Sequence, residues 1–299
     1  MDSKIDYEVN SKENVYFYIR LITSLGLYAL LAKLVSMSLN ITGPQAASIY
    51  VLYFYVVIIV LFIFFRFGLL IGHLKGNAIK LNKNQFPDIY QVVVAQADLL
   101  GLSSVPSVYI LQSGGLLNAF AARFMGRNYI VLYSEIVEAA YVQDKSMLEF
   151  IIAHELGHIK RNHMLKNLLL FPSYLVPFLG AAYSRACEYT CDNIGKALCP
   201  KGAKNGLLVL ASGKSIYRKV NLKEFIKQEK TEDGFWMWFA EKVSSHPNLT
   251  KRLDAMGDLT VQSPVTTARA SFLPPEEPLA GAPAEPEKKE TDYSRYMPQ

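Results

Sequence analysis

Cysteine and charge are both scarce in this chain. Its 299 residues include only three cysteines, too few for a disulfide framework, and this agrees with a reducing compartment. Charged residues make up 19% of the chain, and none falls in residues 46–65. There is no basic–aromatic ladder, no phosphate-binding loop and no internal repeat. We therefore expect no nucleic-acid partner, and the net charge of +5 fits a location beside anionic lipid.

Long apolar segments are present where charge is missing. Residues 46–65, AASIYVLYFYVVIIVLFIFF, are long enough to span a bilayer as a helix. Residues 15–39 are a weaker candidate, because Arg20 and Lys33 must extend their charged groups out of the hydrocarbon. A cleaved signal peptide is the alternative for this segment, but its leader is long and acidic. We predict two transmembrane helices, about 15–39 and 46–65, in a membrane anchor over residues 1–75.

The basic residues predict the orientation of this anchor. The connector at 40–45 has no lysine or arginine, whereas basic residues flank both segments at their other ends. The positive-inside rule then places both termini and the following domain in the cytoplasm, in an integral protein of the inner or plasma membrane. Nothing in the sequence indicates the oligomeric state.

The remaining chain divides into one domain and a tail. Residues 263–299 are rich in proline, alanine and glutamate and too poor in apolar residues to fold, so we predict a disordered tail. Residues 76–262 form the predicted domain. Within it, the segments 106–111, 118–124 and 128–133 are typical of short strands, the last two as a hairpin. The fold class is therefore α+β, with a mostly helical domain and a small sheet after the transmembrane helices.

The segment QDKSMLEFIIAHELGHIKRNHMLKNLLLF, 143–171, predicts one long helix capped by Asp144 and ended by Pro172. It contains HELGH, which places His154 and His158 on one helical face. This is the spacing of a zinc pair, with Glu155 beside the metal as a general base. His163 lies five residues past His158, so on a continuous helix it faces away, and we predict an exposed polar residue.

A catalytic zinc has three protein ligands, and the third is expected on the next helix. His158 is 15 residues before Ser173 and Glu188 is 15 residues after it, so an antiparallel helix pair that turns near Ser173 brings Glu188 level with the histidines. Asp192, one turn further, is placed to accept a hydrogen bond from a ligand imidazole. A solvated acidic face is the alternative.

Cys187 and Cys191 offer a rival ligand pair, since they also share one face of that helix. A site of two histidines and two cysteines is closed and structural, and it leaves Glu155 without a role. We therefore interpret both cysteines as small packing residues.

The motifs AHELGH, SRACEYTCD and SSHPNLTKR together resemble the HtpX-like membrane zinc metallopeptidases, relatives of the CAAX prenyl proteases. The resemblance covers about residues 75–257. It implies a gluzincin endopeptidase with zinc on His154, His158 and Glu188, catalysis by Glu155 and support from Asp192. It also implies that NAFA, 118–121, is an edge strand that binds substrate backbone.

The same resemblance implies roles for the segment HPNLTKR. His246 is expected to donate a hydrogen bond to the oxyanion, or to occupy the open zinc position as a latch. Arg252 is expected to anchor the carboxylates around Glu188 or the substrate backbone. A turn histidine and a surface arginine are the alternatives.

The expected function is zinc-dependent cleavage of protein or peptide substrates at the bilayer, in quality control of misfolded or membrane proteins. Asn118, Ala119 and Phe120 are the predicted substrate-binding residues. An inactive metal-binding adaptor and a prenyl-protein (CAAX-type) peptidase are the alternatives.

Two apolar segments have no role in this scheme. Residues 168–183, LLLFPSYLVPFLGAAY, are expected to enter the bilayer, to cover the active-site cleft or to be buried within the protein. Residues 233–243 pose the same choice, with Trp236 and Trp238 either at the membrane interface or packed inside.

Overall fold

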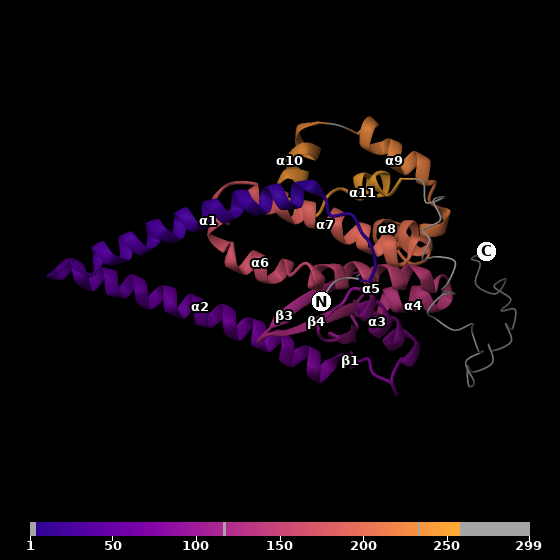
Figure 1. Ribbon diagram of the computed structural model, residues 1–299, viewed down its shortest axis with the longest axis horizontal. Helices are drawn as coiled ribbons and strands as arrows, with labels where there is room; N and C mark the ends of the chain where they lie inside the picture. The colour runs from indigo at the N-terminus through magenta and orange to yellow at the C-terminus, as the bar shows by residue number, and fades with distance from the viewer. Residues whose placement is uncertain (1–3, 116–117, 233, 258–299) are drawn as a thin grey trace, which may run out of the picture.

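The computed structural model describes residues 4–115, 118–232 and 234–257, so the predicted tail lies outside the described residues. Two long helices, α1 (Ser11–Ser38) and α2 (Pro44–Asn77), extend away from a body of helices around a small sheet (Figure 1). Both helices begin before the predicted segments, and α2 ends well after its predicted end. By length and composition both can cross a membrane.

The sheet has four strands in the order β1-β2-β4-β3, and their bounds are Ile79–Lys80 (β1), Ser107–Leu111 (β2), Ala119–Phe124 (β3) and Arg127–Tyr133 (β4). β2 is parallel to β4, and β3 pairs with β4 in the predicted antiparallel hairpin. The two turn residues, Met125 and Gly126, have φ values of 47° and 77°, as a two-residue hairpin turn of the favoured type requires. β3 therefore pairs on one side only and lies at the sheet edge.

The helices of the body are α3 (Pro87–Leu99), α4 (Ser134–Val142), α5 (Lys145–Lys160), α6 (His163–Leu169), α7 (Leu179–Leu198), α8 (Ala203–Ser212), α9 (Leu222–Thr231), α10 (Phe235–Val243) and α11 (Leu249–Met256), with 3-10 turns η1 (Phe171–Leu175), η2 (Pro200–Gly202) and η3 (Tyr217–Lys219). α5 is central and almost wholly buried between the sheet and the helices α7 and α8. The other face of the sheet is covered by Ile71 and Leu74 of α2. The predicted α+β class is confirmed.

The predicted single helix over 143–171 is wrong in its second half. Asp144 caps α5 as expected, since its Oδ1 accepts a hydrogen bond from the Ser146 amide at 3.0 Å. However, α5 ends at Lys160, because Asn162 adopts a left-handed conformation with φ 53° and ψ 37°. Asparagine tolerates this conformation better than most residues do. The break gives the residues after it a new direction.

The expected position of Arg20 is also wrong. We predicted that its charged group extends out of the hydrocarbon, but Arg20 is 0% exposed. Its guanidinium is enclosed where α1 packs against η1 and α7. Lys33, in contrast, is exposed.

Candidate active site

Helices α5 and α7 approach each other closely at Gly157. A Cβ atom at this position lies only 3.2 Å from Cys191 Sγ and 3.3 Å from the Cys191 Cα, so a side chain here pushes the helices apart. Cys187 and Cys191 are both buried, as small packing residues should be. The close approach brings Glu188 of α7 opposite the two histidines of α5, as the turn near Ser173 predicted.

Three side-chain donors converge between these helices. The Nε2 atoms of His154 and His158 are 3.3 Å apart, and the Glu188 carboxylate lies 3.4 Å from the first and 3.3 Å from the second. Ligands bound at about 2.0–2.1 Å to a tetrahedral ion are about 3.3–3.4 Å from one another. The donor set is therefore spaced and composed to hold one zinc ion, with a position left for water.

Two other donor groups in the described chain share His163: one adds His158 and Cys191, the other Glu13 and Cys187. Burial raises the pKa of both thiols above the ordinary value, which favours the thiol over the thiolate that binds metal. These groups are therefore poorer metal sites than the one at Glu188.

Asp192 orients the first histidine. His154 Nδ1 donates to Asp192 Oδ1 at 2.9 Å, which orients the ring so that Nε2 faces Glu188. Arg252 holds the carboxylate in turn, through Nε to Oδ2 at 2.8 Å and Nη2 to Oδ1 at 2.6 Å, and its Nη1 lies 3.2 Å from Glu188. Burial alone raises the pKa of Asp192, but the guanidinium outweighs it and the pKa is lowered. Both groups are therefore charged.

His163 orients the second histidine, which corrects the prediction of an exposed side chain. The break at Asn162 turns it inward, and it is 3% exposed. His158 Nδ1 and His163 Nδ1 are 3.0 Å apart, and His163 Nε2 lies 3.3 Å from Glu13 Oε1 of α1. Burial, the largest cause, lowers the pKa of His163 to about 4, so the ring is neutral at pH 7 and has one donor and one acceptor. His158 donates to it, and it donates to Glu13.

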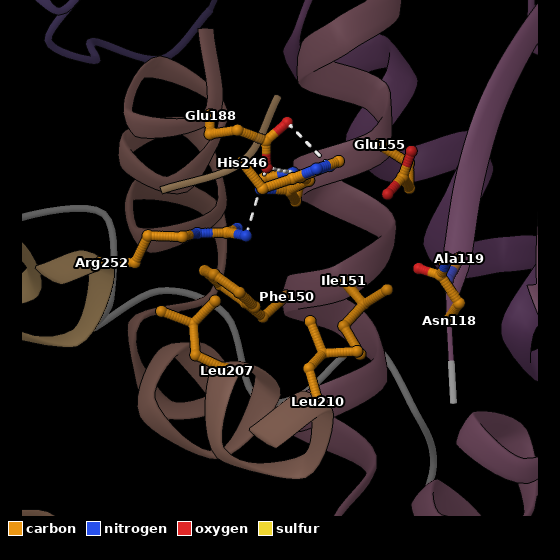
Figure 2. Close-up of a pocket in the computed structure, with 11 residues that line it drawn as sticks. Asn118, Ala119, Phe150, Ile151, Glu155, Glu188, Leu207, Leu210, His246 and Arg252 are labelled. Carbon is orange, nitrogen blue, oxygen red and sulfur yellow. Dashed lines mark hydrogen bonds and ion pairs between the residues drawn. The ribbon is translucent and has the colours of Figure 1, made fainter. Parts of the chain in front are cut away.

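A cavity of about 80 Å³ opens beside these donors (Figure 2). Glu155 projects into it between His246 and the Asn118–Ala119 end of β3. Phe120, in contrast, lies on the other sheet face, where its ring contacts Tyr133. Thus two of the three predicted substrate-binding residues line the cavity with their own atoms.

His246 reaches the same site from the segment before α11. Its Nε2 lies 3.5 Å from Glu188 Oε1, while its side chain is 64% exposed. Its Nδ1 is 3.0 Å from the Ser245 hydroxyl. The structure thus brings His246 and Arg252 to the donor cluster, the first at its open side and the second behind its carboxylates.

Sequence reasoning missed Glu13 and the inward position of His163. Asn162 was the available signal for His163, because asparagine often ends a helix in the left-handed conformation. Glu13 had no local signal, since it lies 150 residues from His163. The docking of α1 on α7 brings it there, through contacts such as the Asn10 amide to Thr190 Oγ1 at 3.1 Å.

The part of the chain that follows the two long helices is similar to known peptidases. The profile of peptidase family M48 matches residues 83–178 and 170–260. The chain is 28% identical over 191 residues to plastoglobule-localized metallopeptidase 48, chloroplastic, of Arabidopsis thaliana, which covers 58% of this chain and 52% of that protein. It is 25% identical over 195 residues to a protease HtpX homolog of Helicobacter acinonychis (strain Sheeba), covering 52% of this chain and 61% of the homolog.

A shorter match is 31% identical over 98 residues to CAAX prenyl protease 1 homolog of Dictyostelium discoideum, covering 31% of this chain and 22% of that protein. Among solved structures, S. mikatae Ste24p is similar with 17% identity and a TM-score of 0.43, covering 81% of this chain and 66% of that one. The chain spans only about half of the Arabidopsis protein's length, and less than two thirds of the Helicobacter protein's.

Proposed function

The chain belongs to peptidase family M48, and from this premise we propose that it is a membrane-anchored, zinc-dependent endopeptidase. The observation that carries the proposal is the convergence of His154, His158 and Glu188 at 3.3–3.4 Å, with Glu155 in the adjoining cavity. Such a site has three protein ligands and an open side, which is typical of catalytic rather than structural zinc.

A zinc ion in this site supplies Lewis-acid polarisation of a carbonyl and brings the pKa of water toward neutrality. Glu155 then acts as general base: it takes the proton from the attacking water and gives it to the leaving amine. His246, at the open side of the cluster, donates a hydrogen bond to the developing oxyanion. Arg252 is a positioning residue, because its guanidinium is occupied by Asp192 and Glu188.

We infer that the substrate binds as an added strand along β3. Within the described sheet this strand pairs only with β4, and its first residue, Ala119, lines the cavity opposite Glu155 together with the preceding Asn118. An extended peptide at this edge gains backbone hydrogen bonds without a strict sequence requirement. The Phe120 side chain points away from the cavity, and this is compatible with a role in substrate binding, because strand addition uses backbone groups.

The anchor is proposed to cross the bilayer as a hairpin of α1 and α2. Their large apolar side chains are exposed over most of both helices, which suits contact with lipid and not with water. A hairpin places the N-terminus and the body on the same side, and the positive-inside rule makes that side the cytoplasm. Misfolded or membrane proteins are then the proposed substrates.

A single variant tests the proposed activity. Full-length protein in detergent is expected to cleave unfolded casein, and a zinc chelator should abolish the cleavage. Glu155→Gln should lose cleavage while it keeps one equivalent of zinc, since Glu155 is not a ligand. Cleavage that persists in Glu155→Gln excludes this mechanism. Zinc binding without cleavage in the wild type supports the adaptor alternative.

The match to a CAAX prenyl protease homolog keeps the prenyl-peptidase alternative in view. The rate of cleavage of a farnesylated peptide, compared with that of its unmodified form, distinguishes the proposed endopeptidase from a prenyl peptidase. Strand addition on β3 predicts similar cleavage of both, whereas a prenyl peptidase requires the lipid.

A further inference from the structure

The turn between α6 and α7 exposes a continuous set of large apolar side chains. We call residues 168–178 the hairpin tip; its exposed members are Leu168, Leu169, Phe171, Tyr174, Leu175, Val176 and Phe178. Leu175 is 77% exposed. Water-soluble surfaces seldom carry such a patch unless something covers it.

The hairpin tip is bound to α1 through Arg20. The Arg20 Nε donates to Ser173 Oγ at 2.8 Å and its Nη1 to Asn167 Oδ1 at 2.5 Å. The guanidinium also lies over two rings, with its carbon 4.7 Å from the Tyr174 centroid and 4.9 Å from the Tyr183 centroid. Figure 1 shows the turn after α6 beside α1, away from the body.

The position of Arg20 along α1 sets the level of the tip relative to a bilayer. A hydrocarbon core of about 30 Å takes about 20 helical residues. The charge-free run 46–65 in α2 has this length and ends at Arg66. The same length counted back from Leu39, at the other side of the α1–α2 turn, reaches Arg20. Arg20 and Arg66 therefore lie at the same boundary.

The contacts between α1 and the tip continue past this boundary. Ser24 and Tyr28 lie one and two turns deeper, about 6 and 12 Å into the hydrocarbon. The Ser24 hydroxyl is 3.3 Å from the Leu170 carbonyl oxygen, and the Tyr28 hydroxyl donates to the Leu169 carbonyl oxygen at 3.0 Å. The tip thus reaches into the near half of the core.

The Leu170 carbonyl of the tip is satisfied by protein donors, in a way that suits lipid. The Leu170 carbonyl accepts from the Ser173 hydroxyl at 2.6 Å and from Arg20 Nη2 at 3.2 Å, in addition to Ser24. Irregular backbone is tolerated in hydrocarbon only where protein groups satisfy it, whereas a loop in water needs no such donors. Arg20 and Ser24 of α1 and Ser173 of the tip itself supply these donors here, and the large apolar side chains of the tip are exposed.

We propose that the hairpin tip is a re-entrant membrane element, inserted among the lipid acyl chains of the near leaflet beside α1. The inference rests on the proposed crossing of the bilayer by α1. Phe178 in the tip contacts Phe239 of α10, with ring centroids 6.2 Å apart. α10 carries both tryptophans of the chain, Trp236 and Trp238, which are 77% and 51% exposed. This helix lies at the headgroup level, where tryptophan is enriched.

The two tryptophans make a fluorescence test practical. In a Trp236→Phe/Trp238→Phe background of the full chain, Leu175→Trp places one tryptophan in the tip. Val142→Trp is the matched control, at the end of α4 in the body, where Val142 is 73% exposed. Ile59→Trp, in the apolar run of α2, is the positive control. Each variant is reconstituted into phosphatidylcholine vesicles with and without brominated acyl chains, and retained casein cleavage shows that it is folded.

Brominated lipid should reduce the fluorescence of both Leu175→Trp and Ile59→Trp, and leave Val142→Trp unchanged. Quenching of Ile59→Trp alone overturns the re-entrant tip and leaves the anchor intact. If Ile59→Trp is not quenched, the crossing of the bilayer fails and the tip proposal fails with it. Shielding of Leu175→Trp from both brominated lipid and aqueous iodide means that protein covers the tip, a second copy included, and also overturns the proposal.

Discussion

The two histidines of the proposed zinc site are supported by different parts of the molecule. His154 donates to the carboxylate of Asp192, which is paired with Arg252 inside the body. His158 donates to a neutral imidazole, His163, whose own acceptor is Glu13 of α1. Both arrangements engage Nδ1 and leave Nε2 directed at the proposed zinc position. The first is a property of the domain alone, while the second depends on the anchor.

Each histidine needs a partner for its Nδ1 atom, and the two partners come from different distances along the chain. Asp192 follows Glu188 by one helical turn, so α7 supplies both the proposed ligand and the partner of His154. Glu13 is brought to the site only by packing of α1 on α7. Variants that remove one support at a time should therefore separate domain effects from anchor effects.

The largest effect is expected from loss of Glu188, the proposed zinc ligand that lies beside both histidines. Glu188→Ala removes a charged donor and leaves Arg252 facing an empty position, so zinc content should fall well below one equivalent and cleavage should be lost. Metal analysis after gel filtration measures this. Glu138→Ala, on the exposed face of α4, is the control and should keep its zinc. Full zinc in Glu188→Ala contradicts the ligand set.

The next largest loss of zinc affinity is expected when Asp192, the partner of His154, is changed. Asp192→Asn leaves the buried Arg252 with Glu188 as its one remaining carboxylate partner in the described chain, so folding stability should fall by less than the roughly 3–5 kcal/mol that a wholly unpaired buried charge costs. Zinc affinity should fall roughly 10- to 100-fold, because the oriented imidazole loses its charged acceptor.

The double variant Asp192→Asn/Arg252→Met sharpens this prediction. It also removes the guanidinium that has lost one of its two carboxylate partners, so thermal stability should recover in part while zinc affinity stays low. Recovery of both properties means that Asp192 acts only by neutralising Arg252.

A smaller effect is expected on the anchor side. His163→Phe keeps the volume of the ring but removes the acceptor for His158, and zinc affinity should fall about tenfold, at the lower end for such partners. His163→Asn offers an amide oxygen instead and should recover part of the loss. Competition with a fluorescent zinc chelator measures both. Equal affinity in wild type and His163→Phe removes His163 from the metal site.

The smallest effect is expected from Glu13→Gln. The amide oxygen can still accept from His163, so zinc affinity should fall by only a few-fold, below the tenfold expected for loss of a direct partner. Glu8→Gln, exposed and five residues earlier, is the control. A loss of thermal stability without any change in zinc affinity shows that Glu13 holds α1 in place and does not act on the metal.

The contrast between Asp192, which is close to Glu188 in sequence, and Glu13, which reaches the site only by packing of α1, explains what could be predicted from sequence. HELGH, Glu188 and Asp192 follow from helical spacing, and the 15-residue arms around Ser173 place them together. The β3–β4 hairpin and the Asp144 cap are equally local. Glu13 and Arg20, in contrast, occupy the start of an apolar helix, where a charge predicts only exposure. Their burial depends on how α1 docks on the body, which no local pattern encodes.

The position of Glu13 bears on how the protein is made. Helix α1 precedes His163 and the donor residues His154, His158 and Glu188 in the chain, so it is synthesised before them. His158 acquires its full hydrogen-bond support only when the domain folds against this helix. A chain in which α1 has not docked on α7 lacks this contact, so docking of the first described helix also completes the hydrogen-bond chain behind His158.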